Sequence, residues 1–186
     1  MAGKFAGVGR AARWLALLGA MAASGGAFAA QEGGVPMPAL SGGVEWLYSP
    51  PLTRESSRGK VALVDFWTYG CINFQRSLPY VNAWAKKYAK EGLVVIGVHT
   101  PEYEEEREVE NVRQQVKKLG IEYPVAIDNN SVIWRAFDNQ YWPAHYFVDA
   151  KGQVRATHFG EGMYQQQEQF IQGVYLPRVM SSDGGM

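Results

Sequence analysis

The apolar residues of this chain follow two patterns that alternate along its length. Some segments are almost continuously apolar, which is typical of short strands in a sheet that is covered on both faces. These segments span residues 60–67, 92–100 and 123–128. In other segments apolar residues recur three or four positions apart, which predicts helices. These helical segments span residues 78–88, 104–119, 130–137 and 163–174.

The ends of two predicted helices carry recognisable signals. In the segment 104–119 the acidic residues lie early and the lysines late, and Gly120 follows, as the helix dipole and a C-cap prefer. We expect Asn130 or Ser131 to cap the helix over 130–137. Both signals support an alternation of strands and helices, and hence an α/β fold.

The last strand patterns predict a hairpin with its turn at residues 149–152. Three strand–helix units followed by a hairpin and a helix predict a central mixed sheet flanked by helices. Right-handed crossovers place the loops that follow parallel strands at one edge of such a sheet. Residues 67–71 and 99–101 follow two of these strands, so we expect them to be neighbours.

The first 29 residues have a different character from the rest. Three basic residues and no acid precede an apolar run at residues 14–23, which is short of the roughly 20 residues that span a bilayer. Small residues follow and end in an A-x-A pattern at 27–29. We interpret residues 1–29 as a secretory signal peptide cut after Ala29, with an uncleaved membrane anchor as the alternative. The mature protein would then be periplasmic or otherwise exported, and would not span a membrane.

Composition suggests how the remaining chain is divided. Residues 30–44 are rich in Gly and Pro and are expected to form a flexible linker. We expect the folded domain over residues 45–176 and a disordered tail over 177–186. The formal net charge is zero and no basic stripe interleaves with aromatics, so nucleic-acid binding has no support.

Cys71 is the only cysteine of the chain, and it stands between a predicted strand and a predicted helix. Exported proteins meet an oxidising compartment, where an unpaired cysteine is either reactive or paired with another molecule. The three histidines, His99, His145 and His158, do not have the spacing of metal ligands. We therefore expect no metal and no cofactor, and a function that rests on the thiol.

Two segments resemble the thioredoxin superfamily. The letters VDFWTYGC at 64–71 resemble the start of its active site, with Asp65 six residues before the cysteine and Pro79 in the following helix. The letters WPAHYFVDAKG at 142–152 resemble the segment that carries its cis-proline, which faces the thiol. An additional strand and helix at 121–138 resemble the redoxin branch, which includes TlpA-like proteins. The resemblance implies a thioredoxin-like fold with a redoxin-type insertion.

Over about residues 45–165 the chain is most similar to the thioredoxin-like domain of DipZ-type thiol:disulfide interchange proteins. The family motif reads C-I-N-C, whereas this chain reads CINF at 71–74, so Phe74 replaces the second cysteine. The second thiol normally releases the substrate by attacking the mixed disulfide from within the enzyme, at a very high effective concentration. Cys71 alone can still attack a disulfide, but another thiol must release it.

The resemblance implies roles for several residues. Cys71 would be the nucleophile, since the positive end of the helix dipole favours a thiolate. Asp65 would tune the site, with a purely structural buried aspartate as the alternative. Pro143 would be cis and close to Cys71, and the backbone at Trp142 would pair with the substrate chain. An ordinary trans proline is the alternative.

Further residues are candidates for contact with a substrate. We expect the aromatic residues Trp67, Tyr69, Phe74 and Trp142 to form an apolar rim for an unfolded chain. The sequence T-Y-G-C places Thr68 three residues before the cysteine, as in peroxiredoxins, where the threonine hydroxyl contacts the peroxide. The preceding proline of that motif is missing, so this second similarity is weaker.

Three hypotheses for function follow. The leading one is an exported monothiol protein of thiol–disulfide exchange, an enzyme of the isomerase or mixed-disulfide type. Its expected partners are exported proteins with thiols or disulfides, and a membrane-bound thiol protein as candidate reductant. The second is a one-cysteine peroxide-reducing redoxin, in which Cys71 becomes a sulfenic acid that an outside thiol reduces. The third is a redox-inactive binding domain that has kept the fold.

Overall fold

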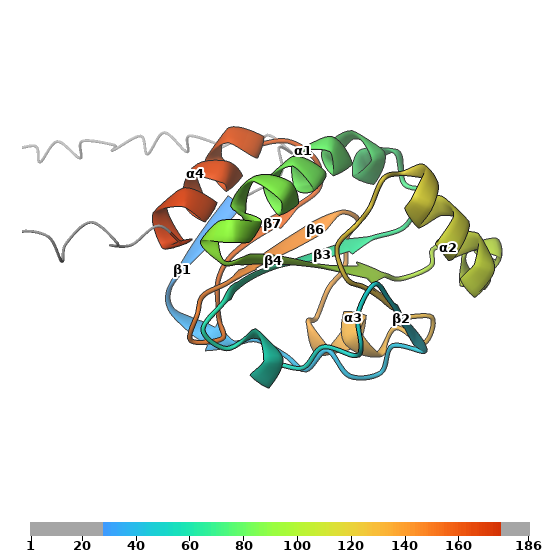
Figure 1. The fold of residues 1–186 in the computed structure, drawn as a ribbon, viewed down its shortest axis with the longest axis horizontal. Coiled ribbons are helices and arrows are strands. Elements are labelled where there is room, and N and C mark those ends of the chain that lie inside the picture. Colours follow the sequence, from blue (N-terminus) through green and yellow to red (C-terminus); the bar gives the residue numbers. More distant parts are fainter. Residues whose placement is uncertain (1–27, 176–186) are drawn as a thin grey trace, which may run out of the picture.

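The computed structural model describes residues 28–175 (Figure 1). Their centre is one seven-stranded mixed sheet with the order β1-β7-β6-β3-β4-β5-β2. The strands are β1 Phe28–Pro36, β2 Glu45–Leu47, β3 Val61–Trp67, β4 Leu93–His99, β5 Val125–Ile127, β6 Ala144–Val148 and β7 Gln153–Phe159. Strands β3, β4 and β5 are parallel, and the other neighbours pair antiparallel. This is the mixed α/β sheet that the sequence predicts.

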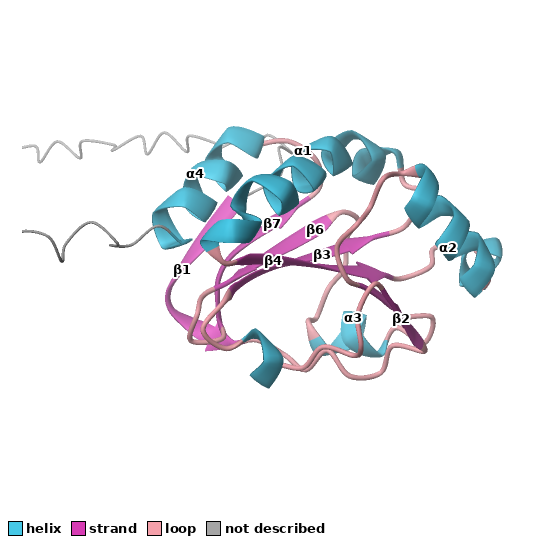
Figure 2. Cartoon of the chain, viewed as in Figure 1, coloured by secondary structure: helices cyan, strands magenta, loops and turns pink. Residues whose placement is uncertain are grey.

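Helices cover both faces of the sheet. The α-helices are α1 Ile72–Tyr88, α2 Val109–Lys118, α3 Val132–Ala136 and α4 Tyr164–Tyr175, and the 3-10 helices are η1 Glu55–Ser57, η2 Ala89–Glu91 and η3 Glu104–Arg107. Helices α1, α2 and α4 lie on one face and α3 lies on the other (Figures 1 and 2). In the described part of the chain, no helix has the length and apolar character needed to cross a membrane.

Strand β3 positions the segment that carries Cys71. All seven of its residues are buried, because β4 and β6 flank it and helices cover both of its faces. Its side chains alternate between two cores: Leu63 and Trp67 face the core under α1, α2 and α4, whereas Val64 and Phe66 face the core next to α3. The strand ends four residues before Cys71, so a rigid element fixes where the cysteine loop begins.

The segment before β2 is not the flexible linker that its composition predicts over residues 30–44. Strand β1 pairs antiparallel with β7, with an irregularity between Ala30 and Val35, and the side chains of Met37 and Leu40 are fully buried in the core next to α3. An edge strand pairs on one side only and therefore tolerates glycine and proline. The Gly- and Pro-rich composition of this segment therefore does not predict the strand.

The boundaries of two helices also differ from the sequence prediction. The helix expected over 104–119 is divided into η3 and α2 at Glu108, which has an extended backbone. Helix α3 is capped neither by Asn130 nor by the side chain of Ser131, although both were candidates. The carboxylate of Asp128 accepts hydrogen bonds from the backbone N–H groups of α3 instead, at 2.7–3.1 Å. The predicted turn at 149–152 is confirmed by the hydrogen bond from Gly152 N–H to the Asp149 carbonyl.

Two predicted terminal segments lie largely or entirely outside the described residues. The signal peptide over 1–29 reaches the described part only in its last two residues, and the tail over 177–186 does not reach it.

Asp128→Ala should destabilise the protein by about 1–3 kcal/mol, because it leaves buried N–H groups at the start of α3 without an acceptor. Urea unfolding measures the change. Asn130→Ala is the matched control, because Asn130 is exposed in the same turn, and it should cost less than about 0.5 kcal/mol. Equal losses in the two variants would contradict the capping role of Asp128.

Candidate functional site

Cys71 occupies the N-cap position of α1, where its side chain is partly exposed and caps none of the helix N–H groups. Its backbone N–H donates to the Thr68 carbonyl at 3.3 Å, and Gln75 N–H donates to the Cys71 carbonyl at 3.1 Å. The thiol faces the backbone carbonyl of Trp142, with Sγ 3.7 Å from that oxygen. The thiol therefore lies between the start of α1 and the backbone of Trp142.

The peptide bond between Trp142 and Pro143 is cis. The indole Nε1 of Trp142 donates to the Thr100 carbonyl at 3.1 Å, which joins this segment to the loop after β4. The predicted proximity of Cys71 and the proline segment is thus present in the structure, and the contact is made through the Trp142 carbonyl.

The loops after β3 and β4 are neighbours, as the sequence predicts. Thr100 N–H donates to the Trp67 carbonyl at 3.0 Å. The ring of His99 lies between two aromatic rings, 4.9 Å from Trp67 and 5.7 Å from Tyr69 between centroids. Burial lowers the pKa of His99 to about 4, so its imidazole is neutral at neutral pH. His99 is therefore a packing residue of this edge.

The predicted aromatic rim is only partly present. Trp67, Thr68 and Phe74 are all fully buried, so the structure does not place them on a surface that a substrate can reach. Phe74 stacks on Trp67 with 4.8 Å between ring centroids and 18° between planes. Position 74 lies three residues into the helix from position 71, and its side chain turns inward. Phenylalanine there extends the core.

A smaller rim remains around the thiol. Tyr69 and Trp142 are partly exposed. Three further apolar or aromatic residues are at least half exposed beside them: Ile72 next to the cysteine, Tyr103 next to Gly70, and Tyr141 next to Trp142. Sequence reasoning missed these three, because exposure depends on how the loops meet.

A buried carboxylate that the sequence did not indicate holds the cysteine loop. Glu106 is 1% exposed, although it belongs to a run of acidic residues, and such runs usually form a solvated surface. Its Oε1 accepts a hydrogen bond from Gly70 N–H at 2.9 Å, and its Oε2 accepts from Glu102 N–H at 2.7 Å and Tyr103 N–H at 3.1 Å. Glu106 thus joins the loop after β4 to the residue immediately before Cys71.

The surroundings of Glu106 favour its charged form. Burial alone would raise its pKa, but the Thr68 hydroxyl and the backbone N–H groups outweigh burial, so the pKa of Glu106 lies below its usual value. A Cβ at Gly70 would lie 2.6 Å from Oε1, so only glycine allows this close approach. Thr68, the candidate peroxide contact, is thus a neighbour of Glu106 in the interior.

Asp65 is fully buried on β3, and Nε2 of His145 lies 3.4 Å from its Oδ1. Tyr123 also contacts this carboxylate: burial and then Asp65 raise the pKa of Tyr123 well above that of a free phenol. Among the described residues, no group of three or more His, Cys, Asp or Glu could hold a metal ion.

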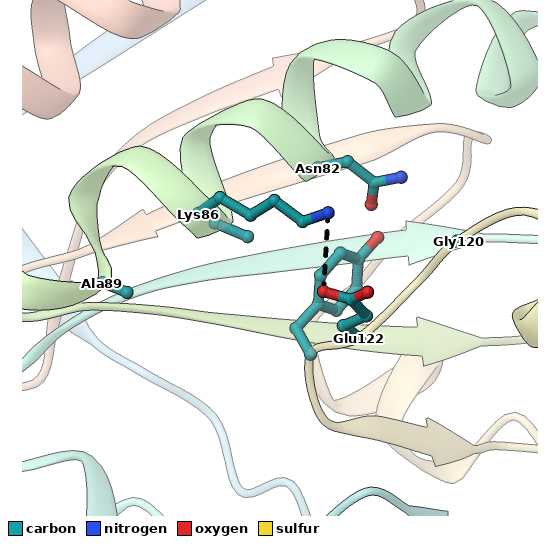
Figure 3. Close-up of a pocket in the computed structure, with 7 residues that line it drawn as sticks. Asn82, Lys86, Ala89, Gly120 and Glu122 are labelled. Atoms are coloured by element: carbon teal, nitrogen blue, oxygen red, sulfur yellow. Dashed lines mark ion pairs between the residues drawn. The ribbon is translucent and has the colours of Figure 1, made fainter.

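A surface pocket of about 240 Å³ is lined in part by Tyr123. It lies between α1, which contributes Asn82 and Lys86, and the segment before β5, which contributes Glu122 (Figure 3). Lys86 and Glu122 form an ion pair across it, with 3.5 Å between Nζ and Oε2. None of the residues that line this pocket belongs to the cysteine loop, so it is separate from the thiol site.

Comparisons with known proteins agree with this geometry. The model of the AhpC/TSA family matches residues 50–157. Protein DipZ of Mycobacterium tuberculosis is 46% identical over 156 residues, which cover 78% of this chain but only 22% of DipZ. The thiol-disulfide oxidoreductase YkuV of Bacillus subtilis is 34% identical over 128 residues, 68% of this chain and 84% of YkuV.

A solved structure confirms the fold. The solution structure of a thioredoxin-like protein in the oxidised form superimposes with a TM-score of 0.70 at 30% identity, and covers 77% of this chain and 96% of that protein. The predicted thioredoxin-like fold and the predicted family resemblance are therefore both confirmed, and the relatives include named thiol-disulfide oxidoreductases. The chain spans about a fifth of the length of the DipZ proteins that it matches.

Glu106→Gln should lower the free energy of unfolding by about 1–3 kcal/mol at neutral pH, because an amide NH₂ cannot accept from a backbone N–H. The folded pKa of Glu106 is lowered, so its contribution is complete above the unfolded pKa of about 4.3 and is lost as the pH falls through the folded value. The stability difference between wild type and variant should therefore shrink in acid, as measured by urea unfolding.

Glu105→Gln is the control for this experiment. Glu105 is the exposed neighbour of Glu106, and the change should cost less than about 0.5 kcal/mol at any pH. A stability difference for Glu106→Gln that grows in acid would contradict the assigned role.

Proposed function

Because the chain belongs to the AhpC/TSA family of thioredoxin-like proteins, we propose that it catalyses thiol–disulfide exchange with one thiol, that of Cys71. One observation carries the proposal. A partly exposed Cys71 lies at the start of α1 with Sγ 3.7 Å from the Trp142 carbonyl, while a buried phenyl ring fills position 74. The attacking thiol is present, and the position three residues later has become part of the core.

The proposed reaction begins with attack of the Cys71 thiolate on a substrate disulfide. A bond forms between Sγ and one substrate sulfur, and the other substrate sulfur leaves as a thiolate. A second thiolate of the same substrate then attacks its own sulfur in the mixed disulfide and expels Cys71. The substrate exchanges one disulfide for another, with no net oxidation or reduction, so no second enzyme thiol is needed.

An outside thiol can release Cys71 in the same way. In that case the outside thiol takes over the disulfide with the substrate sulfur, and Cys71 returns as a thiolate. The proposal therefore includes both isomerisation and monothiol exchange. Substrates would be proteins with thiols or disulfides, and the candidate reductant is a membrane-bound thiol protein.

We assign positioning roles to the residues around the thiol. An extended substrate chain would pair with the backbone at Trp142, next to the cis bond of Pro143, and so bring its sulfur to Cys71. Tyr69 and the indole of Trp142 would contact its apolar side chains. Asp65 would act from the interior, through its effect on charge.

The proposed location is outside the cytoplasm. The basic, then apolar, then small residues of segment 1–29 support export with cleavage after Ala29. The proposed functional unit is the domain over residues 45–176, to which the part of β1 that follows the cleavage point, residues 30–36, would add an edge strand. Peroxide reduction gains no support from Thr68, because this residue is buried and neighbours Glu106.

Refolding of a protein with scrambled disulfides tests the proposal. The wild-type chain should restore activity to the scrambled substrate in a buffer with a trace of small thiol, and Cys71→Ser should not. Mass spectrometry of acid-quenched samples should show substrate attached to Cys71. Equal refolding rates with wild type and Cys71→Ser would refute the proposal and favour a redox-inactive binding domain.

Phe74→Cys should restore a dithiol site. The new thiol would lie three residues from Cys71 and resolve mixed disulfides from within, so reduction of insulin by dithiothreitol should accelerate by at least about tenfold over wild type. Phe74→Ser is the matched control, because it leaves a similar cavity without a thiol. Equal rates for the serine and cysteine variants would show that the site around Cys71 does not support dithiol chemistry.

A further inference from the structure

A row of polar side chains crosses the buried face of the sheet under α1 and α4. The register places His158 of β7 opposite His145 of β6, His145 opposite Asp65 of β3, and Asp65 opposite Gly97 of β4. The first three side chains are at most 1% exposed. A buried charge without a partner is costly, so the protonation states in this row need a structural explanation.

Gly97 opens the space next to Asp65. A Cβ at this position would lie 2.8 Å from Trp67 Nε1 and 3.2 Å from Tyr123 Cε2. Trp67 and Tyr123 therefore occupy the space above Gly97, and Tyr123 also contacts the Asp65 carboxylate. On the β6 side, the neighbour of the Asp65 carboxylate is His145.

Gln167 of α4 determines which nitrogen of His145 carries a proton. Its amide Nε2 donates to the Gly162 carbonyl at 2.7 Å, and a carbonyl can only accept, so the orientation of this amide is fixed. The amide oxygen Oε1 therefore faces His145 Nδ1, at 2.6 Å. Since Oε1 can only accept, Nδ1 must be the donor and carry a hydrogen.

The other nitrogen of the same ring then faces a carboxylate. In a neutral ring with a hydrogen on Nδ1, Nε2 has a lone pair, and it lies 3.4 Å from Asp65 Oδ1. A lone pair against an ionised carboxylate in the interior is unfavourable on both sides. One proton between the two groups removes the conflict, whether it resides on Nε2 or on the carboxyl.

We propose that His145 and Asp65 hold a single proton between them and form a buried pair without net charge, and that Gln167 is the positioning residue that fixes this state. The inference concerns a residue pair that the thiol reaction does not touch. It deepens the proposed function, on which this last step rests: a pair without net charge does not oppose an ionised Cys71, whereas an unpaired buried anion on β3 would.

The other groups that face the pair do not add a charge at neutral pH. From β7, His158 is neutral, because burial and then His145 lower the pKa of His158 to about 4. From the segment before β5, Tyr123 is neutral, because its pKa is raised well above that of a free phenol. From α1, Trp84 contributes an uncharged ring 6.3 Å from that of His145.

Nuclear magnetic resonance of the full chain with ¹⁵N- and ¹³C-labelled histidine and aspartate tests the inference. Long-range ¹H–¹⁵N correlations report which ring nitrogens carry hydrogen, and the carboxyl ¹³C shift of Asp65 reports its protonation. At neutral pH we expect a hydrogen on His145 Nδ1 and one proton in total on Nε2 and the Asp65 carboxyl. A ring protonated only on Nε2, or zero or two protons on the Nε2–carboxyl pair, would overturn the proposal.

Three variants separate Gln167 from its surroundings. Gln167→Leu should abolish the slowly exchanging Nδ1–H signal, whereas Gln166→Leu, an exposed glutamine of the same helix, should retain it. Asp65→Asn should keep the hydrogen on Nδ1 and leave Nε2 without one, because the asparagine amide can donate to it. Movement of the hydrogen to Nε2 in Asp65→Asn would show that Asp65, and not Gln167, sets the tautomer.

These measurements report protonation only and do not depend on disulfide exchange. An inactive Cys71 with the expected ring state would refute the proposed function alone. Active exchange with another ring state would refute the inference alone.

Discussion

The loop that carries Cys71 depends on one buried carboxylate, that of Glu106. Loops cannot usually be buried, because their backbone N–H groups need acceptors. Glu106 supplies acceptors to three such groups from two loops, and one of them belongs to Gly70. These bonds fix the residue before Cys71 relative to the loop after β4, whose Thr100 carbonyl in turn accepts from the Trp142 indole. The three segments that meet at the thiol are therefore connected through polar contacts.

Phe74 shows why the fold is compatible with the loss of the second thiol. Its side chain is fully buried and stacks on Trp67, in the same core as the inner face of α1. A buried phenyl ring contributes several kcal/mol relative to a small side chain. The substitution thus removes a chemical group and adds apolar packing at the same position. Cys71, in contrast to Phe74, is not buried in this core, because it occupies the N-cap of α1 and remains partly exposed.

The sequence predicts those parts of the structure that local patterns determine. Continuous apolar runs indicate β3 and β4. The segment around Pro143 is identified by the similarity of its sequence to the thioredoxin segment that carries the cis-proline. Glu106 could not be identified, because a buried acid and a solvated acid look alike in an acidic run. The buried Gln167 could not be identified for the same reason, because it is one of three consecutive glutamines. Strand β1 was missed because its pairing with β7 joins residues more than a hundred positions apart. Each of these failures concerns a contact across the sheet or between loops.

Three acidic side chains are buried among the described residues, and they are stabilised in different ways. Asp128 accepts N–H groups at the start of α3, and Glu106 accepts N–H groups of two loops. Such donors favour the charged form: they outweigh burial at Glu106, whose pKa is lowered, whereas burial outweighs them at Asp128, whose pKa is raised. Asp65 lies in the middle of β3, where the backbone N–H groups are engaged in the sheet, so only side chains remain as partners. An imidazole is the one partner near it that can exchange a proton at moderate pH. Asp65 and His145 therefore form a buried acid–base pair, and α4 contacts this pair through the amide of Gln167.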